Sequence, residues 1–141
     1  MPDIEGLQHW PGRSGPIPSS TDVMPLASGA TIQSGYPAHT KGAWVELIAS
    51  TSKKAIGIAA SFSCIENPYR YLADVGIGAA GSETVLIPNI YLNIVGITCV
   101  GTTMIFLPCS IPAGTRLSMR FQFTGASYKY GYGAVDLITQ D

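Results

Sequence analysis

An unbroken alternation of polar and apolar side chains runs through Arg116-Leu117-Ser118-Met119-Arg120-Phe121-Gln122-Phe123. In an extended chain the leucine, the methionine and the two phenylalanines fall on one side, because successive side chains of a strand point to opposite faces. This alternation is typical of an antiparallel strand with one face in a core and the other toward water. We therefore expect residues 116–123 to form a half-buried strand of an antiparallel sheet.

Shorter strand signals lie on both sides of this segment. Turn signals separate them, among them Ile111-Pro112-Ala113-Gly114, which has proline and glycine where a type I turn favours them. No stretch has a helical period of convincing length. This spacing favours a β-sandwich or a barrel, and we expect an all-β fold, an antiparallel β-sandwich that is jelly-roll-like. The expected strands are 30–33, 43–49, 56–65, 71–77, 84–95 (with a bulge or an edge position at Pro88), 103–111, 116–123 and 133–139.

The first 22 residues differ from the rest of the chain. Four prolines within them exclude a helix. The segment also carries four large apolar side chains, which are Ile4, Leu7, Trp10 and Ile17. Two interpretations are open: the segment is a flexible tail, or it is an arm that becomes ordered along a neighbouring surface. We expect an extended N-terminal arm over 1–22, with these four as contact residues, and a single β-sandwich domain over 23–141.

Charged residues are scarce throughout the chain. They make up 12% of the sequence, about half of the usual share in a soluble domain, which is roughly a quarter. A chain with so little charge and so many β-forming apolar residues leaves apolar surface uncovered when it is alone. Such surface usually marks a place where another chain sits. We therefore expect the chain to be a subunit of an assembly. We expect that assembly to be a homo-oligomeric closed ring, with three copies as our guess.

Charge and hydropathy also exclude several partners. The net charge is −1, and the eight Lys and Arg residues are scattered, so no basic patch would hold nucleic acid. The best apolar run, residues 85–100, is interrupted by a proline, two asparagines and a glycine, and is shorter than the ~18–20 apolar residues that span a bilayer. The first residues lack the basic start and apolar centre of a secretion signal. We expect no nucleic-acid partner and no membrane insertion.

The residues that most often bind metals or act as bases are few and dispersed. Cys64, Cys99 and Cys109 are spaced as in no zinc site. They are either small buried hydrophobes or include one disulfide, for which the sequence does not choose the pair. His9 and His39 lie in loop-like segments, outside any nucleophile or zinc-helix motif. We expect no metal site and no catalytic histidine.

One motif has the letters of a dinucleotide site. Gly76-Ile77-Gly78-Ala79-Ala80-Gly81 matches G-x-G-x-x-G and follows an expected strand. A dinucleotide site also requires a helix after the glycines and an acidic residue about 20 residues further on. A β-branched segment follows instead, and no acidic residue lies between Glu83 and Asp136. We expect a wide turn in which glycines permit positive φ, and no cofactor.

The carboxylates do not form a recognisable catalytic pair. A glycosidase needs two of them across a cleft. Asp74 with Glu83, or Glu46 with Asp136, could meet in a folded chain, but nothing in the sequence selects either pair. Asp74 and Glu83 flank the glycine turn, and we expect them to cap it or to pair with an arginine of residues 116–123. We expect that the protein is not an enzyme.

Three tyrosines lie close together near the C-terminus: Tyr128, Tyr130 and Tyr132. The glycines around them predict a loop or a tight hairpin over residues 125–133. Aromatic side chains in such a place pack in the hairpin, anchor a protein interface or stack on sugar rings. We expect these three tyrosines to be partner-interface residues, and a glycan platform is the alternative.

Three motifs occur in an order that resembles a known family. They are Trp44-Val45-Glu46-Leu47 followed by Ala49-Ser50-Thr51, then Asp74-Val75-Gly76-Ile77-Gly78-Ala79-Ala80-Gly81-Ser82-Glu83, then Ile111-Pro112-Ala113-Gly114-Thr115-Arg116. In this order they are similar to small virion structural proteins of tailed bacteriophages, over residues 42–123. The resemblance implies a β-sandwich that multimerises in a virus particle, and it implies no catalytic residues.

These observations lead to one expected function and one alternative. We expect a non-enzymatic structural protein of a phage virion, a capsid decoration or cement protein that binds the major capsid protein or another virion protein. Its location would be the virion, assembled in the host cytoplasm. The alternative is a tail, neck or fibre component, with glycan-binding loops as a further option. A small hydrolase would need a polar cleft with converging ionisable groups, for which the sequence offers no support.

Overall fold

The structure, a computed structural model, describes residues 30–64, 70–93, 103–125 and 127–139. Within these ranges the chain forms strands, and it contains no helix of the length and hydropathy that would cross a membrane. The strands are β1 (Ala30–Gln33), β2 (Val45–Ile48), β3 (Ala55–Cys64), β4 (Arg70–Ile77), β5 (Thr84–Asn93), β6 (Thr103–Ile111), β7 (Leu117–Phe123) and β8 (Tyr130–Thr139).

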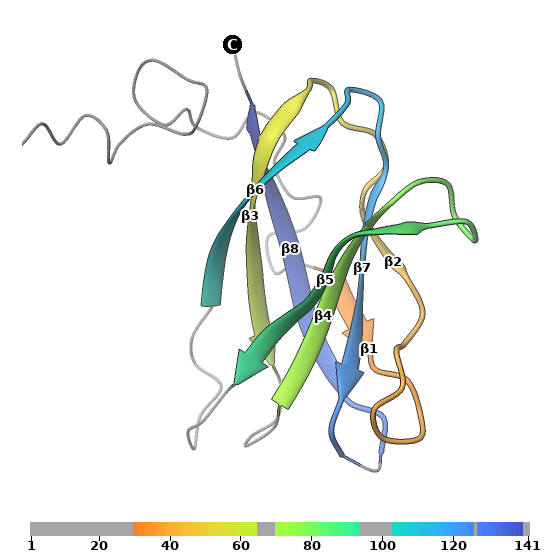
Figure 1. Cartoon of the computed structure of the whole chain (residues 1–141). Coiled ribbons are helices and arrows are strands. Elements are labelled where there is room, and N and C mark those ends of the chain that lie inside the picture. The colour runs from red at the N-terminus through yellow and green to blue at the C-terminus, as the bar shows by residue number, and fades with distance from the viewer. Residues whose placement is uncertain (1–29, 65–69, 94–102, 126, 140–141) are drawn as a thin grey trace, which may run out of the picture.

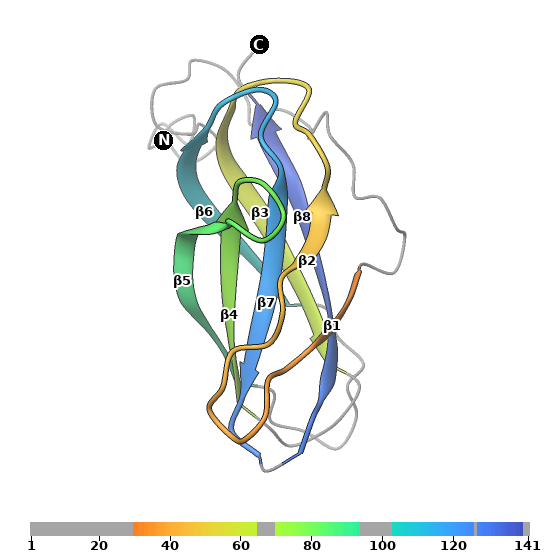
Figure 2. The same cartoon turned by 90° about the vertical axis from the view of Figure 1, so that its right-hand side faces the viewer.

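Two four-stranded sheets face each other. Sheet A has the order β1-β8-β3-β6, and sheet B has the order β2-β7-β4-β5. Figure 1 shows the sheets beside each other, and Figure 2 looks onto sheet B with sheet A behind it. Neighbouring strands are antiparallel throughout. Four of the pairs join strands counted from opposite ends of the chain, which are β1 with β8, β2 with β7, β3 with β6 and β4 with β5. The expected all-β antiparallel sandwich is confirmed.

The strand positions agree with the sequence prediction to within a few residues, except at the start of β8. We expected residues 125–133 to form a loop or a tight hairpin, and this is wrong for 130–133, which belong to β8. The segment is paired on both sides, with Tyr130 opposite Gln33 of β1 and Gly131 opposite Cys64 of β3. Backbone pairing with two neighbours outweighs the low strand propensity of glycine.

The core lies between the sheets, and the alternation in β7 supplies its centre. The four apolar residues of that alternation are at most 2% exposed. Aromatic contacts join the sheets: the ring centroid of Phe62 in β3 lies 6.4 Å from that of Phe121 in β7. Within sheet B, the rings of Tyr71 and Phe123 are 5.0 Å apart. Full burial of a side chain of this size contributes about 1.5–3 kcal/mol. The segment whose alternation predicts a strand therefore also contributes strongly to the stability of the core.

The expected irregularity at Pro88 is present. β5 is the edge strand of sheet B, the place where a proline costs no ladder hydrogen bond. Between the pairs Ala73–Ile90 and Val75–Ile87, β5 has one residue more than β4, so the chain bulges there. Asn89, inside this bulge, has a φ of 54°. The bulge turns the backbone N–H of Asn89 toward the outer face of sheet B, where the charged residues of this sheet gather.

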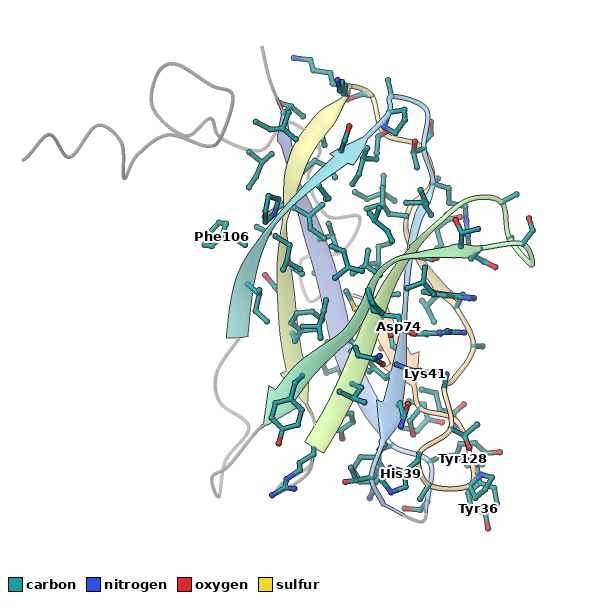
Figure 3. All side chains as sticks on the ribbon, viewed as in Figure 1. Tyr36, His39, Lys41, Asp74, Phe106 and Tyr128 are labelled. Atoms are coloured by element: carbon teal, nitrogen blue, oxygen red, sulfur yellow. The ribbon has the colours of Figure 1, made fainter. Side chains whose placement is uncertain are left out.

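The outer face of sheet A is poor in charged residues. Its four strands contain a single charged residue, Asp136. Ala59, Ala134 and Ile138 alternate with core residues and therefore lie on the outer face, yet they are only 6%, 6% and 4% exposed. On the edge strand β6, Phe106 is 56% exposed and projects away from the sandwich (Figure 3). At the three buried positions the central strands β3 and β8 are buried on both faces, whereas Ser61 and Asp136 on the same outer face are partly exposed.

Candidate functional site

The expected contact residues fall into two groups. Ile4, Leu7, Trp10 and Ile17 lie outside the described residues, as does the whole arm over 1–22. The tyrosine group is described: Tyr128 lies between β7 and β8, and Tyr130 and Tyr132 lie in β8. Tyr128 is 54% exposed and Tyr130 is 45% exposed, whereas Tyr132 is partly buried.

A third exposed tyrosine joins them at one end of the sandwich. Tyr36 is 56% exposed and follows β1, and its ring centroid lies 5.4 Å from that of Tyr128 with the ring planes tilted by 39°. Figure 3 shows the two rings beside each other at the lower end of the molecule. Sequence reasoning missed Tyr36, because it lies in a small, polar segment whose only signal was an aromatic residue before a proline.

The tyrosines line an open pocket of about 400 Å³, which we call the tyrosine pocket. Its wall is formed by the outward-facing ends of β1 and β8 and by the segment that crosses from sheet A to sheet B. The lining residues are Thr31, Gln33, Ser34, Gly35, Tyr36, Thr40, Lys41, Gly42, Ala43, Val45, Tyr128 and Tyr130. Volumes of 300–1,000 Å³ are typical of small-molecule sites.

Hydrogen bonds fix the shape of the tyrosine pocket. The Nε2 of Gln33 donates to the hydroxyl of Tyr130 at 3.0 Å. Ser34, only 2% exposed, holds the loop before β8 in two ways, because its N–H donates to the Lys129 carbonyl at 2.8 Å and its Oγ accepts from the Lys129 N–H at 3.1 Å. On the other side of the pocket, Gly42 lies so close to the backbone of β1 that a Cβ at Gly42 would collide with the Gln33 carbonyl oxygen.

The pocket presents no uncompensated charge among its lining residues. Lys41 is the one charged residue that lines it. Its ammonium group points to the outer face of sheet B and is used there, donating to Oδ1 of Asp74 at 2.7 Å and to Oδ1 of Asn89 at 2.9 Å. The groups that remain for a ligand are hydroxyls, an amide and aromatic faces, which suit a neutral polar molecule.

Asp74 is the centre of a charged network on the outer face of sheet B. It lies between the core residues Ala73 and Val75 of β4, so its side chain points outward, yet it is only 2% exposed. Besides Lys41, it accepts from the backbone N–H of Asn89 at 2.8 Å, and its Oδ2 accepts from Nε of Arg120 at 2.8 Å. Burial alone would raise the pKa of Asp74, but these hydrogen bonds outweigh it and hold the pKa below its ordinary value.

A second arginine holds the glycine turn. Gly78 and Gly81 have φ of 114° and 83°, which confirms the expected positive φ. Arg116 donates to Oε1 of Glu83 at 2.9 Å, to the Gly78 carbonyl at 3.2 Å and to Oε2 of Glu46 at 2.7 Å. The N–H groups of Glu83 itself and of Gly81, together with Arg116, lower the pKa of Glu83 against a smaller effect of burial. The expected pairing of Asp74 and Glu83 with Arg120 and Arg116 is confirmed.

Trp44 covers the outer face of sheet B, and the packing of its ring was not predicted from the sequence. The Cζ of Arg120 lies 4.3 Å from the centroid of its ring, a cation–π distance. The ring also lies against Gly76, where a Cβ would stand 2.7 Å from two ring carbons. Ser118 pairs with Gly76 across the strands and is 0% exposed. The polar side of β7 is therefore not open to water at Ser118, contrary to the simple alternation, because an aromatic ring packs over that region.

The described ranges contain no cluster of potential metal ligands. Three or more His, Cys, Asp and Glu side chains do not gather there as they would around a metal ion. His39 lies in a turn with a φ of 65°, where its N–H donates to the Phe123 carbonyl at 2.8 Å. Cys109 is a free, partly buried thiol in this structure, and burial raises its pKa. Cys99 lies outside the described residues.

Comparison with known proteins adds no relative. No model of a known protein family matches the sequence, and no curated protein matches it.

Proposed function

We propose that this chain is a non-enzymatic structural protein of a phage virion, a capsid decoration or cement protein that stabilises the shell through oligomeric apolar interfaces. The proposal combines the resemblance of residues 42–123 to small virion structural proteins with the surface of sheet A. It takes the partners to be further copies of this chain and the major capsid protein or another virion protein.

The outer face of sheet A is the observation that carries the proposal. Many charges of the described residues lie elsewhere: on the outer face of sheet B, three cations (Lys41, Arg116, Arg120) pair with three carboxylates (Glu46, Asp74, Glu83). Sheet A has only Asp136 in its strands. The part of this face that stays exposed is the edge strand β6, where Phe106 is 56% exposed. A charge-poor edge with an exposed aromatic ring suits an interface, because stable protein interfaces commonly bury about 1,600 Å² in total and have cores depleted of charge.

The strand order supports the assignment of the sandwich as a jelly roll. Pairing of β1 with β8, β2 with β7, β3 with β6 and β4 with β5 is the pattern of one long hairpin rolled into two sheets. We propose that the sandwich is an eight-stranded jelly roll, an architecture that occurs in viral capsid proteins and also in lectins. A fold of this kind is compatible with a virion protein but does not by itself define the function.

The N-terminal arm has a role in this proposal. Residues 1–22 precede β1, which is one of the two edge strands of sheet A, and their four large apolar side chains are suited to anchoring on an apolar surface. We propose that the arm clamps a neighbouring copy, so that many weak contacts add up over the shell.

The test measures assembly and attachment with the full chain and three variants. Light scattering after size-exclusion chromatography should give an oligomer for the full chain and a monomer for Phe106→Asp. Val85→Asp, at an apolar residue that is 44% exposed on the edge strand of sheet B, should remain oligomeric. A chain without residues 1–22 should fold but be lost from purified particles during washing. A full chain that is monomeric at all concentrations and absent from particles would overturn the proposal.

A second candidate function is a tail, neck or fibre component with glycan-binding loops. The tyrosine pocket is the specific observation that favours it. Electron microscopy of particles labelled with an antibody against this chain separates a position on the shell from a position on the tail.

A further inference from the structure

We infer that the tyrosine pocket is a binding site for a neutral saccharide. This inference deepens the second candidate function, because it names the ligand class of the same pocket. It does not depend on the proposed cement role, because the pocket, formed by Tyr36, Tyr128, Tyr130 and Gln33, lies at the end of the sandwich. It can therefore fail while the proposed assembly stands, and the reverse.

The aromatic groups supply the first half of the recognition. Tyr36, Tyr128 and Tyr130 are among the few large hydrophobic side chains of the described residues that remain about half exposed. Tyr36 and Tyr128 pack against each other, with ring centroids 5.4 Å apart, which holds both rings in place at the pocket edge. The face of an aromatic ring is electronegative, so it attracts the C–H groups on the apolar face of a pyranose ring.

The polar groups supply the second half. The Gln33 amide is oriented by its hydrogen bond to the Tyr130 hydroxyl, and its oxygen remains to accept from a sugar hydroxyl. Thr31 and Thr40 add hydroxyls to the same lining. A few positioned polar groups beside apolar walls are the usual composition of a small-molecule site. Hydroxyl and amide groups that both donate and accept match the hydroxyls of a sugar.

The electrostatics exclude charged ligands. The ammonium of Lys41 is bound to Asp74 and Asn89, and the other lining residues are uncharged. A phosphate, a sialic acid or a uronic acid would lose its hydration without gaining a cation, which is unfavourable. A volume of about 400 Å³ accommodates one or two sugar rings. The ligand class is therefore a neutral mono- or disaccharide, or the end of a neutral glycan.

The experiment is a titration of the ¹⁵N-labelled full chain with lactose, maltose, cellobiose and N,N′-diacetylchitobiose, followed by backbone amide shifts. At least one sugar should shift the amides of Gly35, Gly42 and Tyr130. Tyr128→Ala and Gln33→Ala should each weaken that binding by about tenfold, as expected from the loss of one stacking or hydrogen-bonding contact.

Tyr91→Ala is the matched control. Tyr91 is 54% exposed, as is Tyr128, but it lies on β5 outside the tyrosine pocket, so its removal should leave the affinity unchanged. The inference is overturned if none of the four sugars shifts the pocket amides. It is also overturned if Tyr128→Ala binds as well as the unmodified chain, or if sialyllactose binds more tightly than lactose.

Discussion

Arg120 and Asp74 form a directed ion pair across β7 and β4, in which Nε of Arg120 donates to Oδ2 of Asp74 at 2.8 Å. The carboxylate side chain is 3% exposed and the arginine side chain 26% exposed. The pair therefore lies at the boundary between protein and water, beneath the Trp44 ring that contacts the guanidinium. Such a pair is sensitive to the loss of one member, because the other charges remain without compensation.

Asp74→Asn should destabilise the fold by about 3 kcal/mol, since it leaves Lys41 and Arg120 close together without the carboxylate that compensates them. Urea denaturation followed by circular dichroism measures this change. Glu46→Gln is the control, because the Glu46 side chain is 49% exposed in its pair with Arg116, and such a pair contributes about 1 kcal/mol or less. Equal losses in the two variants would contradict the assigned role of Asp74.

Acidification should weaken the fold through the same carboxylates. The pKa values of Asp74 and Glu83 are lowered in the folded state, so the folded protein binds fewer protons than the unfolded chain. Their contribution is complete above the unfolded values, about 3.9 for Asp and 4.3 for Glu, and is lost as the pH falls through the lower folded values. Denaturation midpoints measured between pH 7 and pH 2 should show the stability gap to Asp74→Asn closing only below about pH 4. A gap that closes near neutrality would argue against this origin.

Gly76→Ala should displace Trp44, because the new Cβ would stand 2.7 Å from the ring. The expected loss is about 1–3 kcal/mol, the usual cost of overpacking, together with a red shift of Trp44 fluorescence in a Trp10→Phe background. Gly81→Ala is the comparison: nothing lies within 4 Å of its Cβ position, and its φ is 83°. It should cost stability through backbone strain alone and leave the emission of Trp44 unchanged. An unshifted spectrum in Gly76→Ala would show that the contact does not hold the ring.

Ser118→Ala should leave stability unchanged or raise it by up to about 1 kcal/mol. The Ser118 Oγ is buried and has no hydrogen-bond partner within the described part of the chain, so its removal relieves a desolvation cost. Ser34→Ala is the matched control, because the buried Ser34 Oγ accepts from the Lys129 N–H; its loss should cost about 1–2 kcal/mol. Thermal unfolding of both variants measures the difference, and a clear loss in Ser118→Ala would reveal a partner for the hydroxyl.

Some of the site could be predicted from the sequence. The alternation of residues 116–123 placed the arginines on the side opposite the core, and the positions of Asp74 and Glu83 around the glycine turn suggested their pairing with those arginines. The pairs were predictable because they depend on neighbouring strands and on local turn chemistry. Tyr36 was not, because it meets Tyr128 only after β1 and β8 pair, and no local pattern reports a contact over that separation.

The amino-acid pattern by itself determined the all-β class, most strand positions, the turn glycines and a bulge or edge position at Pro88. Period-two alternation and backbone geometry are local properties, so they can be deduced from a short window of residues. Only the tertiary structure decided that β8 begins at Tyr130, that Trp44 packs over Gly76, and that Tyr36, Gln33 and Tyr130 share one pocket. These features depend on which strands become neighbours, and that choice is made by the burial of the whole core rather than by any single segment.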